Sequence, residues 1–258
     1  MVPDAQIKPG VPTEHIDWIA QYAVDKRPDV IVVMGDWADM PSLSSYDIGK
    51  KSFEGRTYRD DILAANDALQ RLMAPIKAEM ERREKLHMKR WTPRLIVTLG
   101  NHEDRINRAI ENDRKLEGLI STDDIFFKQW GFEVYPFLEV VVVDGVAYAH
   151  YFISGVMGRP ITTARALLQK KYMSCVGAHQ QGFDVATAYK GDGTRITGII
   201  IGSCYLHDEN FLGPQGNKHF RGVGVLHEVH NGEFDHMTVS LRFLKERYGK
   251  AQEKAQAA

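Results

Sequence analysis

The sequence predicts a layered α/β fold, and three kinds of pattern support this prediction. Short, mostly apolar runs at 30–34, 95–99 and 196–203 have the length and composition of buried strands. An amphipathic helical pattern over 13–26 precedes the first of these runs, and a second predicted helix over 162–172 precedes the last. Asp-Gly and Asn-Gly dipeptides between apolar runs are typical of tight β-hairpins. Buried strands that alternate with helices along a chain indicate a fold of the α/β class.

The first helix is expected to begin at Thr13, a candidate N-cap, and to end at Lys26, because Pro28 cannot continue it. Its apolar face is predicted to consist of Ile16, Ile19, Ala20, Ala23 and Val24. The apolar run at 30–34 follows directly and is predicted to end at a glycine and Asp36. This arrangement places a carboxylate at the carboxyl end of a buried strand.

The longest interruption between predicted strands covers residues 41–92. It starts as a Ser-rich loop and continues as a charged helical stretch over 58–90, which Pro75 is expected to split or kink. We therefore expect an inserted helical pair. The basic residues within 82–90 are predicted to form a solvated helix face, and contact with a nucleic-acid backbone is the alternative.

Two β-hairpins are predicted in the second half of the chain. The runs 138–143 and 146–152 flank Asp144-Gly145, and residues 222–244 fold around Asn231-Gly232. We interpret residues 1–244 as a single domain and the polar, Ala-rich residues 245–258 as a C-terminal tail.

Composition excludes several classes of protein. Hydrophobic residues make up 43%, charged residues 26%, and the net charge of -1 gives no general attraction to nucleic acid or membrane. Cys175 and Cys204 are too few for a disulfide framework or a Cys-rich zinc site. No apolar run reaches the roughly 18 residues of a membrane span, and no signal-peptide pattern is present. We expect a soluble, cytoplasmic protein that does not bind membranes.

Five short polar clusters follow predicted strands. They are Asp4-Ala5-Gln6, Gly35-Asp36-Trp37-Ala38-Asp39, Gly100-Asn101-His102-Glu103, His150 and His179-Gln180-Gln181. Ligands in open α/β sheets gather outside the carboxyl ends of the strands, and glycine permits the tight turns that present side chains there. We therefore expect these clusters to converge at one edge of the fold.

In order and residue type, these clusters resemble the calcineurin-like metallophosphoesterase superfamily. The family pattern runs Asp-x-His, Gly-Asp-x-x-Asp, Gly-Asn-His-Asp/Glu, His and Gly-His-x-His, and the resemblance covers residues 4–181. It implies a four-layer metallophosphoesterase sandwich, in which two mixed β-sheets are flanked by helices. The helical interruption and the Gln-containing last motif are also similar to phosphoesterases encoded by bacteriophages.

The resemblance implies two divalent metal ions bridged by Asp36. One ion would be held by Asp4, Gln6, Asp36 and Gln181, and the other by Asp36, Asn101, His150 and His179. His102 would lie beside the phosphate as an acid or charge stabiliser, and Asp39 would orient it. The ions would activate water for attack on phosphorus.

The sequence departs from the family pattern at Gln6 and Gln181, where the family usually has His. Amide oxygens are poorer zinc ligands than imidazoles, so we expect Mn²⁺, with Mg²⁺, Zn²⁺, Fe and Ca²⁺ as alternatives. Only three residues precede Asp4, where the family has a full first strand, so we expect a truncated start.

The functional expectation is a hydrolase of phosphate esters, either a phosphodiesterase or a phosphomonoesterase, with a nucleotide or nucleic acid as a possible substrate. A nuclease of the same superfamily and a degenerate, non-catalytic scaffold are the alternatives. The two Gln substitutions favour the scaffold, whereas the retained second metal site and His102 favour the enzyme. The oligomeric state is not predicted.

Further candidates lie outside the five clusters. Glu103 and Arg105 are expected to brace their loop, and contact between Arg105 and phosphate is the alternative. The irregular segment 205–221 has the length of a functional loop. It supplies three candidates for substrate contact, which are His207, His219 and Arg221.

Overall fold

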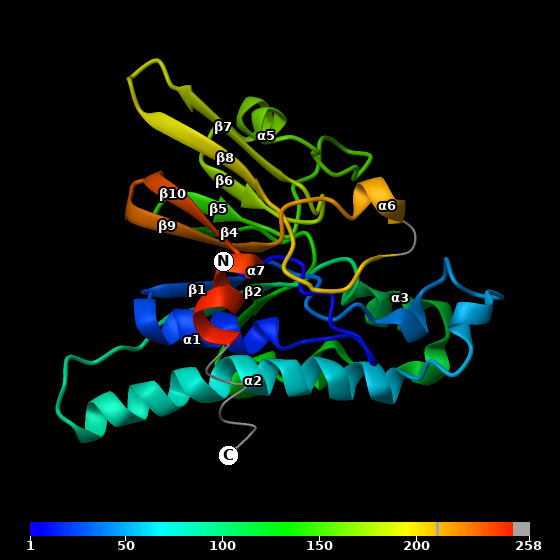
Figure 1. The fold of residues 1–258 in the computed structure, drawn as a ribbon. Helices are drawn as coiled ribbons and strands as arrows, with labels where there is room; N and C mark the ends of the chain where they lie inside the picture. Colours follow the sequence, from blue (N-terminus) through cyan, green and yellow to red (C-terminus); the bar gives the residue numbers. More distant parts are fainter. Residues whose placement is uncertain (210–211, 250–258) are drawn as a thin grey trace.

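The computed structural model describes residues 1–209 and 212–249, and these form an α/β fold with parallel and mixed sheets (Figure 1). The helices are α1 (His15–Lys26), α2 (Tyr58–Lys85), α3 (Asp104–Asn112), α4 (Phe127–Trp130), α5 (Ala164–Lys171), α6 (Gly213–Gly216) and α7 (Leu241–Leu244). The strands are β1 (Val30–Val33), β2 (Arg94–Thr98), β3 (Glu133–Tyr135), β4 (Val141–Val143), β5 (Val146–Tyr148), β6 (Cys175–Gly177), β7 (Phe183–Tyr189), β8 (Arg195–Ile201), β9 (Gly222–His230) and β10 (Glu233–Ser240).

The first sheet has the parallel order β1-β2-β3. The N-terminal segment extends it, because the Val2 amide donates to the Val32 carbonyl at 2.8 Å and the Met34 amide donates to Val2 at 2.8 Å. On its other side this segment reaches the β9-β10 hairpin, where the Met1 amino group donates to the Gly224 carbonyl at 2.9 Å. Residues 1–7 therefore lie beside β1 and link it to the hairpin.

The second sheet has the order β4-β5-β6-β8-β7. Its inner strands β5, β6 and β8 are parallel, and β4 and β7 pair antiparallel at the two edges. Helix α5 packs closely on β8 at Gly198, where a Cβ atom would lie 2.6 Å from the Ala164 carbonyl oxygen. A larger residue at Gly198 would push this helix off the sheet.

The two sheets pack face to face and carry helices on their outer faces. Val32, Met34 and Ile96 of the first sheet share one buried cluster with Tyr148, Val176 and Ile199 of the second. Helices α1 and α2 form another cluster with the opposite face of β1 and β2, and α5 covers the outer face of the second sheet. The carboxyl ends of the parallel strands in both sheets can therefore contribute to one site.

The prediction of a helical pair in 41–92 is wrong. One helix, α2, runs unbroken through Pro75, although proline removes a backbone hydrogen bond. The residues around Pro75 hold the helix in place, since Leu72, Met73 and Ile76 are buried. Just before them, Arg71 Nε donates to Asp17 of α1 at 2.9 Å. Tertiary packing outweighs the local effect of Pro75.

Thr13 is not the N-cap of α1, and this prediction is also wrong. The helix begins at His15, with Glu14 in the N-cap position, while the Thr13 hydroxyl accepts a hydrogen bond from Arg71 at 2.5 Å. Arg71 of α2, which also pairs with Asp17 of α1, thus donates to the hydroxyl that the sequence assigned to capping.

Both predicted hairpins are confirmed as β4-β5 and β9-β10, with shorter strands in the first. Of the predicted tail, Lys245–Gly249 is a π-helical turn that contacts α1 through the edge-to-face pair of Tyr22 and Tyr248, and 250–258 lie outside the described residues. Within the described part of the chain, no helix is long and apolar enough to cross a membrane.

The buried His15 side chain makes the stability of the folded protein sensitive to acid. Both of its ring nitrogens are buried without a hydrogen-bond partner among the described residues, and burial lowers its pKa to about 3. Below about pH 6.5 the His15 imidazole of the unfolded chain binds a proton, whereas that of the folded chain stays neutral down to about pH 3. The free energy of unfolding is therefore highest above about pH 6.5 and falls as the pH decreases towards 3. At about 1.4 kcal/mol per pKa unit, the loss amounts to several kcal/mol.

We expect His15→Leu to raise the free energy of unfolding and to flatten its pH dependence between about pH 6.5 and 3, because an apolar side chain leaves no nitrogen unpaired. Urea unfolding at several pH values measures both effects, with the exposed His236→Leu as the matched control. An unchanged pH dependence in His15→Leu would show that His15 does not titrate on unfolding.

Candidate metal centre

Two glycine turns present the central side chains. Gly35 and Asp36 follow β1 with φ angles of 81° and 46°, so the chain reverses sharply where that strand ends. A Cβ atom on Gly35 would lie 2.7 Å from the Thr98 carbonyl oxygen, and one on Gly100 would lie 2.4 Å from the Asp36 nitrogen. Only glycine permits this approach of the turns after β1 and β2.

Glu103 fastens the two turns to each other. Its carboxylate accepts hydrogen bonds from the backbone amides of Asp36 at 3.0 Å, Ala38 at 2.8 Å and Gly100 at 2.7 Å. The side chain is fully buried, and burial together with the Asp36 charge raises the pKa of Glu103. The expectation that Glu103 braces this loop is confirmed.

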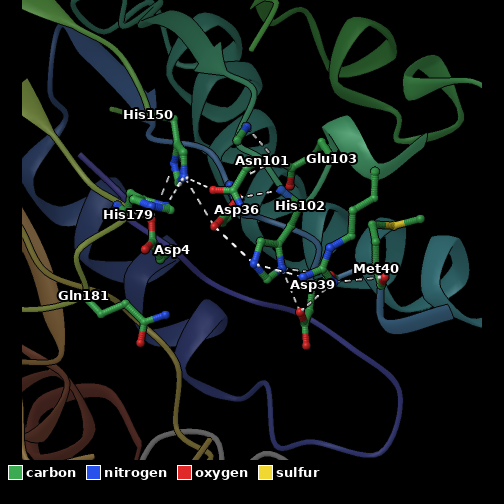
Figure 2. Close-up of polar contacts among 12 residues, drawn as sticks. Asp4, Asp36, Asp39, Met40, Asn101, His102, Glu103, His150, His179 and Gln181 are labelled. Carbon is green, nitrogen blue, oxygen red and sulfur yellow. Dashed lines mark hydrogen bonds and ion pairs between the residues drawn. The ribbon is translucent and has the colours of Figure 1, made fainter. Parts of the chain in front are cut away.

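Asp36, His150 and His179 bring their ligand atoms together, all within 4.8 Å of one another (Figure 2). Nε2 of His150 lies 3.3 Å from Oδ2 of Asp36 and 3.3 Å from Nδ1 of His179. Oδ1 of Asn101 lies 3.0 Å from the same nitrogen. Oxygen atoms of Asp36 and Asn101 and a nitrogen of His179 thus lie close to Nε2 of His150, and these are atom types that bind divalent cations.

A backbone carbonyl on the side away from the cluster sets the orientation of His150. Its Nδ1 lies 2.8 Å from the Met34 carbonyl and donates to it, so in the neutral ring Nε2 directs its lone pair into the cluster. Burial would lower the pKa of His150, but the Asp36 and Asp4 carboxylates together outweigh burial and raise it to about 10, so a metal ion bound at Nε2 would displace a proton. Burial and the His150 charge lower the pKa of His179 to about 4.

Asp4 supplies a second carboxylate beside these groups. Its Oδ1 accepts a hydrogen bond from the His179 amide at 3.3 Å, whereas Oδ2 is buried with no partner among the described residues. Burial raises the pKa of Asp4 to about 7. An unpaired buried carboxylate oxygen is costly, and a bound cation would satisfy it.

Asp36 remains ionised in this environment. Burial would raise its pKa, but the neighbouring His102 and His150 hold the pKa well below its usual range. The Asp36 carboxylate lies between two imidazoles and also accepts the His102 amide at 3.0 Å. It is therefore the most central anion of the cluster.

His102 and Asp39 form a pair at the edge of the cluster. Nδ1 of His102 lies 2.8 Å from Oδ1 of Asp39, and the opposite nitrogen Nε2 lies 3.7 Å from Oδ2 of Asp36. Burial would lower the pKa of His102, but the charge of Asp36 and the hydrogen bond to Asp39 raise it. Arg105 Nη2 lies 3.3 Å from Nε2 of His102, and Nη1 donates to the Asp39 carbonyl at 2.6 Å.

Gln6 and Gln181 are each held by a hydrogen bond. The side-chain oxygen Oε1 of Gln181 accepts a hydrogen bond from the Tyr205 hydroxyl at 2.6 Å. Figure 2 draws no contact between Gln181 and the cluster. Gln6 is buried, and its backbone N–H donates to the backbone carbonyl of Asp36 at 2.8 Å. Metal ligation by either side chain stays a prediction.

The three loop candidates have partners in or next to their own loop. His207 lies 2.7 Å from Glu209, His219 lies 2.9 Å from the Ser203 hydroxyl, and Arg221 donates to Asp208 at 2.7 Å. His219 also lines a pocket of about 380 Å³ with His179 and Gln181. Substrate contact by these residues stays a prediction.

Sequence analysis missed Lys8, Glu209 and Tyr151. Lys8 lies 2.9 Å from Asp39 and 2.5 Å from Glu209, and Tyr151 packs on His179 with ring centroids 4.7 Å apart. Tyr151 could have been found from its position directly after His150. Lys8 and Glu209 carry no such signal, because they are 201 residues apart and belong to no motif.

Neither a comparison with models of protein families nor one with curated proteins finds a match to this chain.

Proposed function

We propose that this protein is a metal-dependent hydrolase of phosphate esters, related to the calcineurin-like metallophosphoesterases. The observation that carries the proposal is the convergence of Asp36, His150 and His179 within 4.8 Å, directly beside the His102–Asp39 pair. A metal-ligand cluster alone would suit a structural site. A buried imidazole held by a carboxylate at the edge of that cluster adds a group for proton transfer.

The layered architecture supports the same proposal. Two facing sheets with helices on their outer faces are compatible with the four-layer metallophosphoesterase sandwich. The cluster draws on the turns after β1, β2, β5 and β6, and these belong to both sheets. Such an edge, where strands of two sheets end, is a favoured place for ligands.

The donor set fits divalent cations. One ion would be held by Asp36, Asn101, His150 and His179, and a second by Asp36 and Asp4, with Gln6 and Gln181 as the remaining candidates. The mixture of carboxylate, amide and imidazole donors suits Mn²⁺, with Mg²⁺, Zn²⁺, Fe and Ca²⁺ as alternatives. When bound, two such ions supply Lewis acidity and a nucleophile at neutral pH.

The protein's own side chains have separate roles in the proposed reaction. Asp36 would contribute to both metal positions, because its Oδ2 lies 3.3 Å from Nε2 of His150 and 3.7 Å from Nε2 of His102. Asp39 holds Nδ1 of His102, so that Nε2 faces the cluster and can give a proton to the leaving oxygen. The Arg105 guanidinium beside His102 adds positive charge where a phosphate would lie.

The proposal is tested by removing metal from purified protein with a chelator, adding Mn²⁺ back, and measuring hydrolysis of an aryl phosphomonoester and an aryl phosphodiester. We expect no turnover without metal and turnover of at least one ester with Mn²⁺. Preference for the diester would favour a phosphodiesterase or nuclease. Absence of turnover with both esters in protein that binds Mn²⁺ would favour the non-catalytic scaffold instead.

His102→Ala is expected to lower turnover by about 10²- to 10⁴-fold, the usual contribution of a general acid, and to leave the metal content intact. His102 contacts Asp39, but it is not one of the three residues whose ligand atoms lie together, which are Asp36, His150 and His179. Metal analysis of the purified variant, together with turnover at saturating ester, measures both effects. Loss of metal from His102→Ala would show that this residue is a ligand.

A further inference from the structure

A row of alternating charges leads away from the metal centre. Lys8 Nζ lies 2.9 Å from Oδ2 of Asp39 and 2.5 Å from Oε1 of Glu209. Between 11% and 18% of each of these three side chains is exposed, so solvent screens the contacts only weakly. Lys8 is thus a cation between two carboxylates, one of which holds His102.

The two oxygens of Asp39 have different partners. Oδ1 lies 2.8 Å from Nδ1 of His102, and Oδ2 lies 2.9 Å from Lys8 Nζ. A carboxylate whose second oxygen is held by an ammonium group cannot rotate freely, so its first oxygen stays directed at the imidazole. Removal of Lys8 would free the Asp39 carboxylate to turn, and Nε2 of His102 would lose its fixed direction.

Glu209 is itself held firmly in its loop. Its backbone amide and carbonyl both bond to the side-chain amide of Asn217 at 2.9 Å, and its carboxylate lies 2.7 Å from Nε2 of His207. The loop that carries Glu209 therefore anchors Lys8 from the side opposite Asp39. The same ammonium group therefore contacts both Glu209 and the carboxylate that holds His102.

We propose that Lys8 is a positioning residue, which aligns the Asp39–His102 pair, and that Glu209 fastens Lys8 to the loop of residues 205–221. This inference rests on the proposed function for its kinetic consequence. Lys8 orients Asp39, and Asp39 orients His102, which gives a proton to the leaving oxygen. Esters with poor leaving groups need this proton most, so their turnover depends most on Lys8.

The kinetic test uses Lys8→Met and a series of aryl phosphate esters whose leaving phenols differ in pKa. We expect turnover of the poorest leaving groups to fall by about 10- to 100-fold, with little change for the best leaving groups and for metal content. Lys8→Arg keeps the charge and is expected to restore part of the loss. Lys50→Met is the matched control, because Lys50 pairs with Asp47 at 2.8 Å on the surface.

A second measurement does not depend on activity. In Zn²⁺-loaded protein, the Nδ1 proton of His102 is expected to give a slowly exchanging NMR signal, because Asp39 accepts it. In Lys8→Met, and to a smaller extent in Glu209→Gln, this signal is expected to broaden through exchange with water. Glu209→Gln also serves if Lys8→Met fails to fold.

The outcomes separate this inference from the proposed function. If the parent hydrolyses esters but Lys8→Met and Glu209→Gln match it across the whole series, with the His102 signal unchanged, the positioning role is wrong. If the parent hydrolyses none of the esters, the proposed function fails, and the NMR signal alone then decides whether Lys8 aligns the pair. Equal loss for all leaving groups in Lys8→Met would also overturn the inference.

Discussion

Asp36→Asn is expected to reduce hydrolysis of phosphate esters by about three orders of magnitude or more. The substitution removes the negative charge that faces both His150 and His102, and it leaves an amide where the proposed metal centre has a shared carboxylate. We also expect weaker binding of Mn²⁺, because the remaining imidazoles of the cluster are not joined by a shared anion. Turnover and Mn²⁺ titration of the same preparation measure the two effects.

The substitution is chosen to leave the fold intact. Asn has nearly the shape of Asp and tolerates the φ of 46° at this position, so the turn after β1 can form. Asp29→Asn is the control, since Asp29 is exposed and lies at the other end of the same strand. A folded Asp36→Asn protein with the turnover of Asp29→Asn would exclude Asp36 from the reaction.

Glu103→Ala is expected to cost the protein about 3 kcal/mol or more of stability. Three buried backbone amides, those of Asp36, Ala38 and Gly100, lose their acceptor, and an unsatisfied buried donor costs about 1–3 kcal/mol. The same change is expected to loosen the turn that presents Asp36 and so to weaken metal binding. Urea unfolding in the presence of a chelator measures the loss of stability without any contribution from metal.

Glu103→Gln separates hydrogen bonding from cavity formation. Gln keeps the volume and one acceptor oxygen but points an NH₂ group at backbone donors, so its stability is expected to lie between those of the parent and Glu103→Ala. Equal stability of Glu103→Ala and the parent would mean that the two turns are held by other contacts.

The sequence was informative wherever a local pattern decides the structure. The apolar runs that became β1 and β2 predicted buried strands, and the Asp-Gly and Asn-Gly turns predicted both hairpins. Gly35 and Gly100 follow predicted strands, and on this basis we expected the side chains beside them to converge. Asp36 was found in this way, whereas His150 and His179 were found from their positions after predicted strands and from the family resemblance. In the structure the two turns approach so closely that only glycine fits.

The failures of prediction arise where contacts distant in sequence decide the outcome. Helix α2 continues through Pro75 because its buried face packs on α1, which no local rule describes. Strand β7 was missed because it is an edge strand with mostly exposed or half-buried residues and no continuous apolar run. Lys8 joins Asp39 to Glu209 only after folding brings three separate segments together.

Diffraction from crystals soaked in Mn²⁺, with the anomalous signal of manganese, tests the central claim most directly. The account predicts one anomalous peak within coordination distance of Asp36, His150 and His179, and a second that shares Asp36 and is bound by Asp4. Both peaks are expected to disappear or weaken in Asp36→Asn. Crystals that take up Mn²⁺ elsewhere, with no peak among Asp36, His150 and His179, would contradict the assignment of this cluster as a metal centre.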